Sequence, residues 1–79
     1  MPIVTIKLLK EFITPELKAK YIARISDAVA YVIVQASGAH REKVLALVMS
    51  SVEEIPSENW GSAGVPLTPE SIKEVLGIS

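Results

Sequence analysis

The sequence predicts an α/β (α+β) fold: a single β–α–β unit with parallel strands, then a C-terminal turn or hairpin and a short last helix. Three observations predict it. Short runs rich in Ile, Val and Leu occur at residues 3–9 and 43–52, and a segment with helical periodicity, residues 15–37, lies between them. The chain has 79 residues, enough for one small domain, residues 1–79. Two strands joined by a helix run parallel, with a right-handed crossover.

The first strand is predicted at residues 3–9, where the sequence reads IVTIKLL. Its apolar residues follow one another almost without interruption, which is typical of a strand covered on both faces. Pro2 comes directly before it. Proline is tolerated at the first position of a strand because its missing N–H costs no ladder hydrogen bond.

The helix is predicted between Thr14 and Gly38 by signals at both ends. Thr14 is a suitable N-cap, Pro15 suits the first helical position, and Glu16 lies at the positive end of the helix dipole. Gly38 suits the left-handed residue that ends a helix. The later part reads AVAYVIVQA and is apolar around much of its circumference. We therefore expect tertiary or subunit contacts to cover it.

The second strand is predicted at residues 43–52, and the rest of the chain reads as a loop, a turn and a helix. Gly61 and Gly64 mark the turn. Thr68 and Pro69 are the expected cap and first-turn residue of a short C-terminal helix.

Composition indicates that the chain assembles with copies of itself. It has no cysteine and one histidine, His40, so neither a disulfide nor a zinc or other metal site is expected. Yet 49% of its residues are hydrophobic, and the mean hydropathy is +0.38. A two-stranded sheet forms no independent core, and domains of this size tend to need a further source of stability. We therefore expect a homo-oligomer.

Charge and hydropathy argue against several classes of partner. The net charge is −1 and the eight Lys and Arg residues are scattered, so no nucleic-acid binding is expected. Every apolar run is far shorter than the roughly 18 residues of a membrane helix, so no membrane association is expected. The start lacks the pattern of a secretory signal, and the expected location is cytoplasmic.

Pro2 also has a chemical interpretation. Methionine aminopeptidases remove an initiator methionine when the next residue is small, and proline qualifies, so removal of Met1 would leave a secondary amine. An α-amino group has a pKa of about 7.7–8.0, and burial in an apolar pocket lowers the pKa of an amine. A general base works best when its pKa lies near the operating pH. Pro2 is therefore a candidate catalytic base, and the alternative is that it only protects the start of a strand.

Four stretches together resemble the 4-oxalocrotonate tautomerase family of the tautomerase superfamily. They read MPIVTIKLL, TPELK, KVLALVM and ENWGSAGVP, in that order. The resemblance covers Pro2 to about Pro66. It implies β–α–β units that assemble into homo-oligomers, with a hexamer favoured and a dimer or trimer possible. It also implies proton transfer by the amino-terminal proline on a small-molecule substrate, with no cofactor and no metal.

The resemblance implies roles for particular residues. Pro2 matches the family's catalytic proline. Trp60 matches the aromatic residue that walls the substrate pocket, and packing at a subunit interface is an equal alternative for it. The turn from Gly61 to Gly64 matches the glycine-rich hairpin by which one subunit extends the sheet of another.

The chain departs from the family pattern at two arginines that bind the carboxylates of 2-oxo dicarboxylates. The first belongs in the loop before the helix, where this chain has Phe12 or Ile13. The second belongs near the start of the second strand, where this chain has Leu45. The pocket is therefore expected to be apolar, lined by Phe12, Leu45 and Trp60.

Three cations are candidates to replace the missing arginines. Lys10 lies beside the first position. Lys43 lies two residues before Leu45, on the same face if this segment is a strand. Arg41 lies in the connection before that segment. The alternative for each is a solvated surface charge.

These residues predict a cofactor-independent tautomerase, an isomerase that moves a proton between carbon and oxygen of a small enol or 2-oxo compound. Two alternatives stand beside it. In the first alternative the chain is a non-catalytic oligomeric protein of the same fold. In the second it is a small-molecule-binding protein that uses the apolar pocket.

The missing arginines predict a substrate preference. A hydrogen bond from a guanidinium to a carboxylate contributes about 1.5–3 kcal/mol, and burying a carboxylate without such a partner costs several kcal/mol. At roughly 1.4 kcal/mol per tenfold, we expect kcat/KM for a neutral or monocarboxylate enol to exceed that for a 2-oxo dicarboxylate by about 10²-fold or more. Initial rates on matched substrates measure this. A preference for the dicarboxylate would contradict it, and Lys43→Ala would then test the nearest candidate cation.

Overall fold

The computed structural model describes residues 2–78. Strands, α-helices and two short 3-10 helices follow one another along the chain: β1 (Ile3–Leu9), η1 (Lys10–Phe12), α1 (Pro15–Ser37), α2 (Arg41–Leu45), β2 (Met49–Ile55), η2 (Ser57–Asn59), β3 (Gly61–Ser62), β4 (Val65–Pro66) and α3 (Pro69–Leu76). The contacts between residues divide the chain into two compact units. The first contains the chain up to Ile6 and Thr14–Glu53, and the second contains Lys7–Ile13 and the chain from Glu54 onward.

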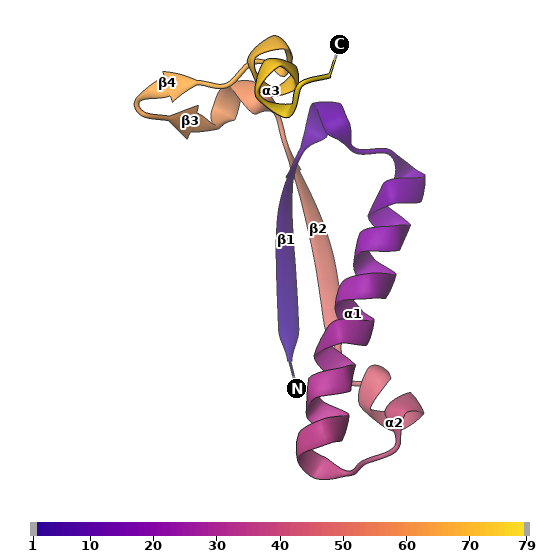
Figure 1. The fold of residues 1–79 in the computed structure, drawn as a ribbon. Helices are drawn as coiled ribbons and strands as arrows, with labels where there is room; N and C mark the ends of the chain where they lie inside the picture. Colours follow the sequence, from indigo (N-terminus) through magenta and orange to yellow (C-terminus); the bar gives the residue numbers. More distant parts are fainter. Residues whose placement is uncertain (1, 79) are drawn as a thin grey trace. The chain divides into compact units, whose positions relative to one another are not determined.

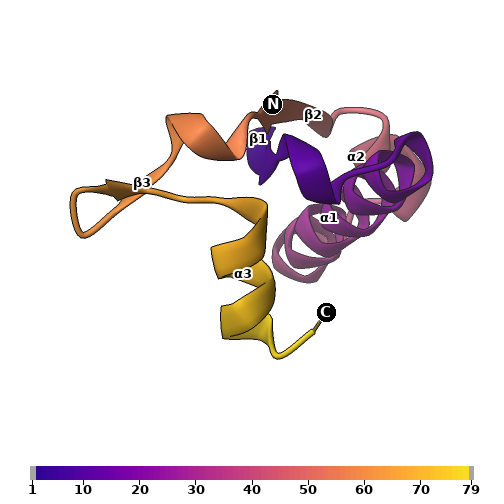
Figure 2. The same cartoon turned by 90° about the horizontal axis from the view of Figure 1, so that it is seen from above.

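Strands β1 and β2 form a two-stranded sheet and run in the same direction, with α1 as the connection between them (Figure 1). Helix α1 lies along one face of these strands (Figure 2). Exposure alternates along β1, where Ile3, Thr5 and Lys7 are open to solvent and the residues between them are half-buried. A hydrogen bond of 2.7 Å between the hydroxyls of Ser26 and Ser50 joins α1 to β2. The predicted β–α–β unit with parallel strands is confirmed.

The ends of α1 lie where the sequence predicts them. The Thr14 hydroxyl accepts a hydrogen bond of 3.2 Å from Leu17 N–H, and Pro15 is the first helical residue. At the other end Gly38 has φ of +73° and donates its N–H to Val34 at 2.8 Å. Glycine takes this left-handed conformation without the steric cost that a side chain would add.

The second strand begins later than the sequence predicts. Residues 43–52 were expected to form it, but α2 occupies Arg41–Leu45 and β2 runs over Met49–Ile55. Helical hydrogen bonds explain the difference, since Val44 N–H donates to His40 C=O at 3.1 Å and Ala46 N–H to Glu42 C=O at 3.2 Å. Periodicity does not separate a short buried helix from a short buried strand, and this segment contains several good helix formers.

The interior of the first unit is small. Three apolar side chains are buried, Ala30 of α1 at 0% exposure, Val44 of α2 at 6% and Val48 at 9%, and neighbouring residues of α1 and α2 pack against them. Among the described residues no large side chain is fully buried. Tyr31 and Val32, in the apolar part of α1, remain about two-thirds exposed, at 65% and 64%.

The second unit contains the hairpin that the glycines predict. Gly61 pairs with Pro66 and Ser62 with Val65, and the turn between them has positive φ at Ala63 (+54°) and Gly64 (+80°). Two consecutive positive φ angles are typical of a type I′ turn, whose twist matches that of the flanking strands.

Helix α3 also begins as predicted. Thr68 and Ser71 each bond the other's backbone N–H at 3.1 Å, which forms a capping box, and Pro69 is the first helical residue. No helix within residues 2–78 has the length and apolar character of a membrane span.

The small interior predicts self-association. Exposed apolar side chains on α1 and β1 gain stability when a second copy covers them, since burying apolar surface contributes about 25 cal/mol per Å². We expect sedimentation velocity at micromolar concentration to give an oligomer. A folded species with the mass of one chain would contradict this.

Candidate active site

Pro2 lies at the head of β1, and its backbone is anchored to β2. It is half-buried, and its carbonyl accepts a hydrogen bond of 3.1 Å from Met49 N–H, the first residue of β2. This bond fixes the residue at one end of the sheet. Met1, whose removal would free the Pro2 amine, lies outside the described residues.

Lys43 and Leu45 both belong to α2, so the expectation that they share one face of a strand is wrong. Residues two apart on a helix differ by about 200° in direction, because there are 3.6 residues per turn. The two side chains differ accordingly in burial. Leu45 is half-buried and packs against Ala30, Val44 and Val48, while Lys43 is exposed.

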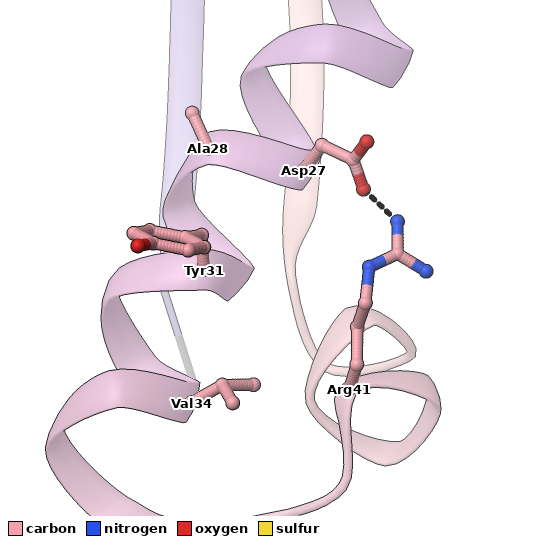
Figure 3. A pocket seen from close by; sticks show the side chains of 5 residues that line it. All are labelled: Asp27, Ala28, Tyr31, Val34 and Arg41. Atoms are coloured by element: carbon pink, nitrogen blue, oxygen red, sulfur yellow. Dashed lines mark hydrogen bonds and ion pairs between the residues drawn. The ribbon is translucent and has the colours of Figure 1, made fainter.

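Arg41 has a partner within its own chain. At the start of α2 its guanidinium forms an ion pair with Asp27 of α1, beside a shallow hollow of about 310 Å³ that Ala28, Tyr31 and Val34 also line (Figure 3). Both side chains are about half exposed, at 53% and 55%. An exposed pair of this kind typically contributes about 1 kcal/mol or less.

Lys10 and Phe12 follow β1, at the opposite end of this strand from Pro2. Both belong to η1, where Lys10 is exposed and Phe12 is half-buried. Strand β1 has seven residues, which span about 23 Å at 3.3 Å per residue. The whole of β1 therefore lies between Pro2 and the pair Lys10 and Phe12 along the chain.

Trp60 follows η2 and is held through its backbone. Its N–H donates to Ser57 C=O at 3.0 Å, and its C=O accepts from Leu67 N–H at 3.0 Å. The side chain is half-buried, and its Nε1–H is buried with no hydrogen-bond acceptor among the described residues. A buried donor without an acceptor costs about 1–3 kcal/mol.

Glu11 is a residue of this region that the sequence does not single out. Both of its carboxylate oxygens accept the Ser57 N–H, at 2.8 and 2.9 Å. Hydrogen bonds from the backbone and side chain of Ser57 lower the pKa of the Glu11 carboxyl, with a smaller contribution from the charge of Lys10. The partners are 46 positions apart, so no local pattern indicates the contact.

Residues 2–78 contain no group of three or more His, Asp or Glu side chains placed to hold a metal ion. That the reaction needs no metal and no cofactor stays a prediction.

Comparison with known proteins defines the class. Residues 2–69 match the family of tautomerase enzymes, and the chain belongs to this family. The resemblance to 4-oxalocrotonate tautomerases is confirmed at this level. Members of the family are oligomeric. No curated protein matches the chain.

Two solved structures are similar to it. One is a protein of methicillin-resistant Staphylococcus aureus assigned as a 4-oxalocrotonate tautomerase, at 29% identity and a TM-score of 0.57, over 82% of this chain and 90% of that one. The other is DmpI of Helicobacter pylori, at 24% identity and a TM-score of 0.62, over 92% of this chain and 97% of that one. The second shows the fold alone.

The Glu11–Ser57 contact predicts a dependence of stability on acid. Since the pKa of Glu11 is lowered from 4.5 in the folded state, the contact stabilises the fold above pH 4.5 and loses this effect as the pH falls through the lowered pKa. We expect the free energy of unfolding to fall more steeply below pH 4.5 in wild type than in Glu11→Gln. Denaturant titrations at fixed protein concentration measure this, with Glu58→Gln as the matched control. Parallel curves for wild type and Glu11→Gln would contradict it.

Proposed function

We propose that this chain is a cofactor-independent keto–enol tautomerase in which the amine of Pro2, exposed by removal of Met1, is the general base. The family match begins at residue 2 and supports this proposal. The observation that carries it is the position of Pro2, half-buried at the head of β1 with its carbonyl anchored to Met49. A rigid, partly desolvated amine suits proton transfer near neutral pH.

The reaction moves one proton and needs no redox partner. The neutral amine accepts the proton of the enol hydroxyl, and the oxygen–carbon bond becomes a carbonyl. The electrons of the carbon–carbon double bond take a proton from the resulting ammonium, which returns Pro2 to its neutral form. Atoms and charge balance without a metal or a cofactor.

The proposed pocket is apolar and forms between copies of the chain. Since β1 separates Pro2 from its own Phe12, we assign Phe12 and Trp60 at each site to a neighbouring copy. Leu45 forms part of the wall, and Lys10 and Lys43 are candidate cations at the rim. Family members are oligomeric, which supports a shared site, and a hexamer is the assembly that we propose.

The substrate class that fits this pocket is a small neutral or monocarboxylate enol. By the resemblance, Phe12 or Ile13 stands in place of the first arginine that would bind a dicarboxylate, and Leu45 in place of the second. Arg41 is the arginine nearest to Leu45 in the sequence, and its guanidinium is paired with Asp27. An apolar wall leaves a second carboxylate without a partner, which costs several kcal/mol.

The same departures favour a second candidate, a non-catalytic oligomeric or small-molecule-binding protein of this fold. In such a protein the apolar pocket binds a ligand without moving a proton. Catalysis by Pro2 distinguishes the two candidates.

The test combines the mass of the protein with its activity. Intact-mass spectrometry of natively expressed protein is expected to give the mass without Met1. This protein is expected to ketonise phenylenolpyruvate, and Pro2→Ala is expected to reduce kcat/KM about 10²-fold or more, the usual range for a general base. A primary amine is less basic and less rigidly held than that of proline.

Pro15→Ala is the matched control, because it makes the same change at the exposed first residue of α1. It is expected to keep wild-type activity. Equal rates for wild type and Pro2→Ala would overturn the role of Pro2. A processed wild type that is inactive on neutral and monocarboxylate enols would favour the non-catalytic candidate.

A further inference from the structure

Glu11 holds the start of the segment that carries Trp60. Its two carboxylate oxygens accept Ser57 N–H at 2.8 and 2.9 Å, and Ser57 is buried, with 4% exposure. Ser57 is the first residue of η2, where backbone N–H groups lack helical acceptors. Pro56, the residue before it, makes no side-chain cap. Glu11 therefore caps η2 from a distant part of the sequence.

From Ser57 a series of backbone hydrogen bonds leads to Trp60 and beyond. Ser57 C=O accepts from Trp60 N–H at 3.0 Å, and Trp60 C=O accepts from Leu67 N–H at 3.0 Å. Asn59 N–H donates to Pro56 C=O at 2.9 Å and closes the same turn. Ser57 N–H and Pro56 C=O belong to one peptide group, so the negative charge of Glu11 polarises that group and strengthens its hydrogen bond from Asn59 N–H.

The indole of Trp60 adds no polar anchor of its own. Its Nε1–H is buried and has no acceptor among the described residues. The orientation of the ring therefore depends on packing and on the backbone bonds that begin at Glu11.

We propose that Glu11 is a positioning residue: its carboxylate fixes the segment from Pro56 to Trp60 and thereby holds Trp60 as the aromatic wall of the pocket. This inference rests on the proposed function, because the orientation of Trp60 affects activity only if Trp60 lines the pocket of a tautomerase. Glu11 acts through Ser57 and Trp60 and does not contact the reacting atoms.

The charged groups around Glu11 are few. Its carboxylate lines a hollow of about 500 Å³ with Lys10 of η1 and Glu58 of η2, and α3 contributes Pro69. Lys10 favours the ionised form of Glu11, as do the hydrogen bonds from Ser57. Glu58 lies on the same short helix as Ser57 and is exposed, so it provides a matched control.

The test compares Glu11→Gln with Glu58→Gln and wild type. Glutamine keeps the length of the side chain but loses the charge and one acceptor oxygen. Trp60 is the single tryptophan of the chain, so its fluorescence reports this segment alone. In Glu11→Gln we expect red-shifted emission, greater quenching by acrylamide, and a several-fold rise in KM with little change in kcat. Glu58→Gln is expected to match wild type in all of these.

A second measurement starts with the wild-type protein, so its first result does not depend on how well the variants fold. In wild type, the proton resonance of the Ser57 amide is expected to titrate with a midpoint below 4.5, the ordinary pKa of the carboxyl. Trp60 emission is expected to shift with the same midpoint, and the titration is expected to vanish in Glu11→Gln and to persist in Glu58→Gln.

The outcomes separate this inference from the proposed function. If Trp60 emission, quenching and KM are unchanged in Glu11→Gln, or if the Ser57 amide does not titrate, Glu11 is not the positioning residue. If wild type has no tautomerase activity, the proposed function fails and so does the role of Glu11 in a pocket. The Ser57 and Trp60 signals then still decide whether Glu11 holds the segment.

Discussion

A β–α–β unit buries few apolar side chains, and this small core is the constraint on which the rest of the structure depends. One helix covers one face of two strands, and the buried apolar cluster of the first unit consists of Ala30, Val44 and Val48. Helix α2 supplies Val44, so even this cluster needs the short helix between α1 and β2. Apolar side chains such as Tyr31 and Ile3 stay exposed in one copy. The chain belongs to a family whose members are oligomeric, and a two-stranded sheet forms no independent core.

The same constraint explains why polar contacts do so much of the local positioning. Where few side chains are buried, a segment is held by its hydrogen bonds. The second unit has no buried apolar residue among those described, and its hydrogen bonds include a capping box, those of a type I′ hairpin and the Glu11–Ser57 contact. Trp60 is held through its backbone for this reason. A charged acceptor gives the stronger kind of hydrogen bond, which suits a position with little packing around it.

The residues that we propose for the pocket divide between the two ends of one strand. Pro2 precedes β1, while Lys10 and Phe12 follow it. The seven residues of β1 lie between them in the chain, and for this reason we propose a pocket that forms between copies. In our proposal the departures from the family's arginines affect the same site. Leu45 contributes to the interior and Arg41 is paired with Asp27, so α2 serves packing in this chain.

The sequence alone determined the elements whose signals are local. Thr14 with Gly38, Thr68 with Pro69, and Gly61 with Gly64 predicted the bounds of α1, the start of α3 and the hairpin, because caps and turns act over a few residues. The motifs around Pro2 and Trp60 also predicted the family. Only the tertiary structure decided the boundary between α2 and β2, since Val44 and Val48 suit a buried helix, turn or strand equally and their packing against Ala30 selects one. It also decided the role of Glu11, whose partner lies 46 residues away and is brought near only when β1 and β2 pair side by side.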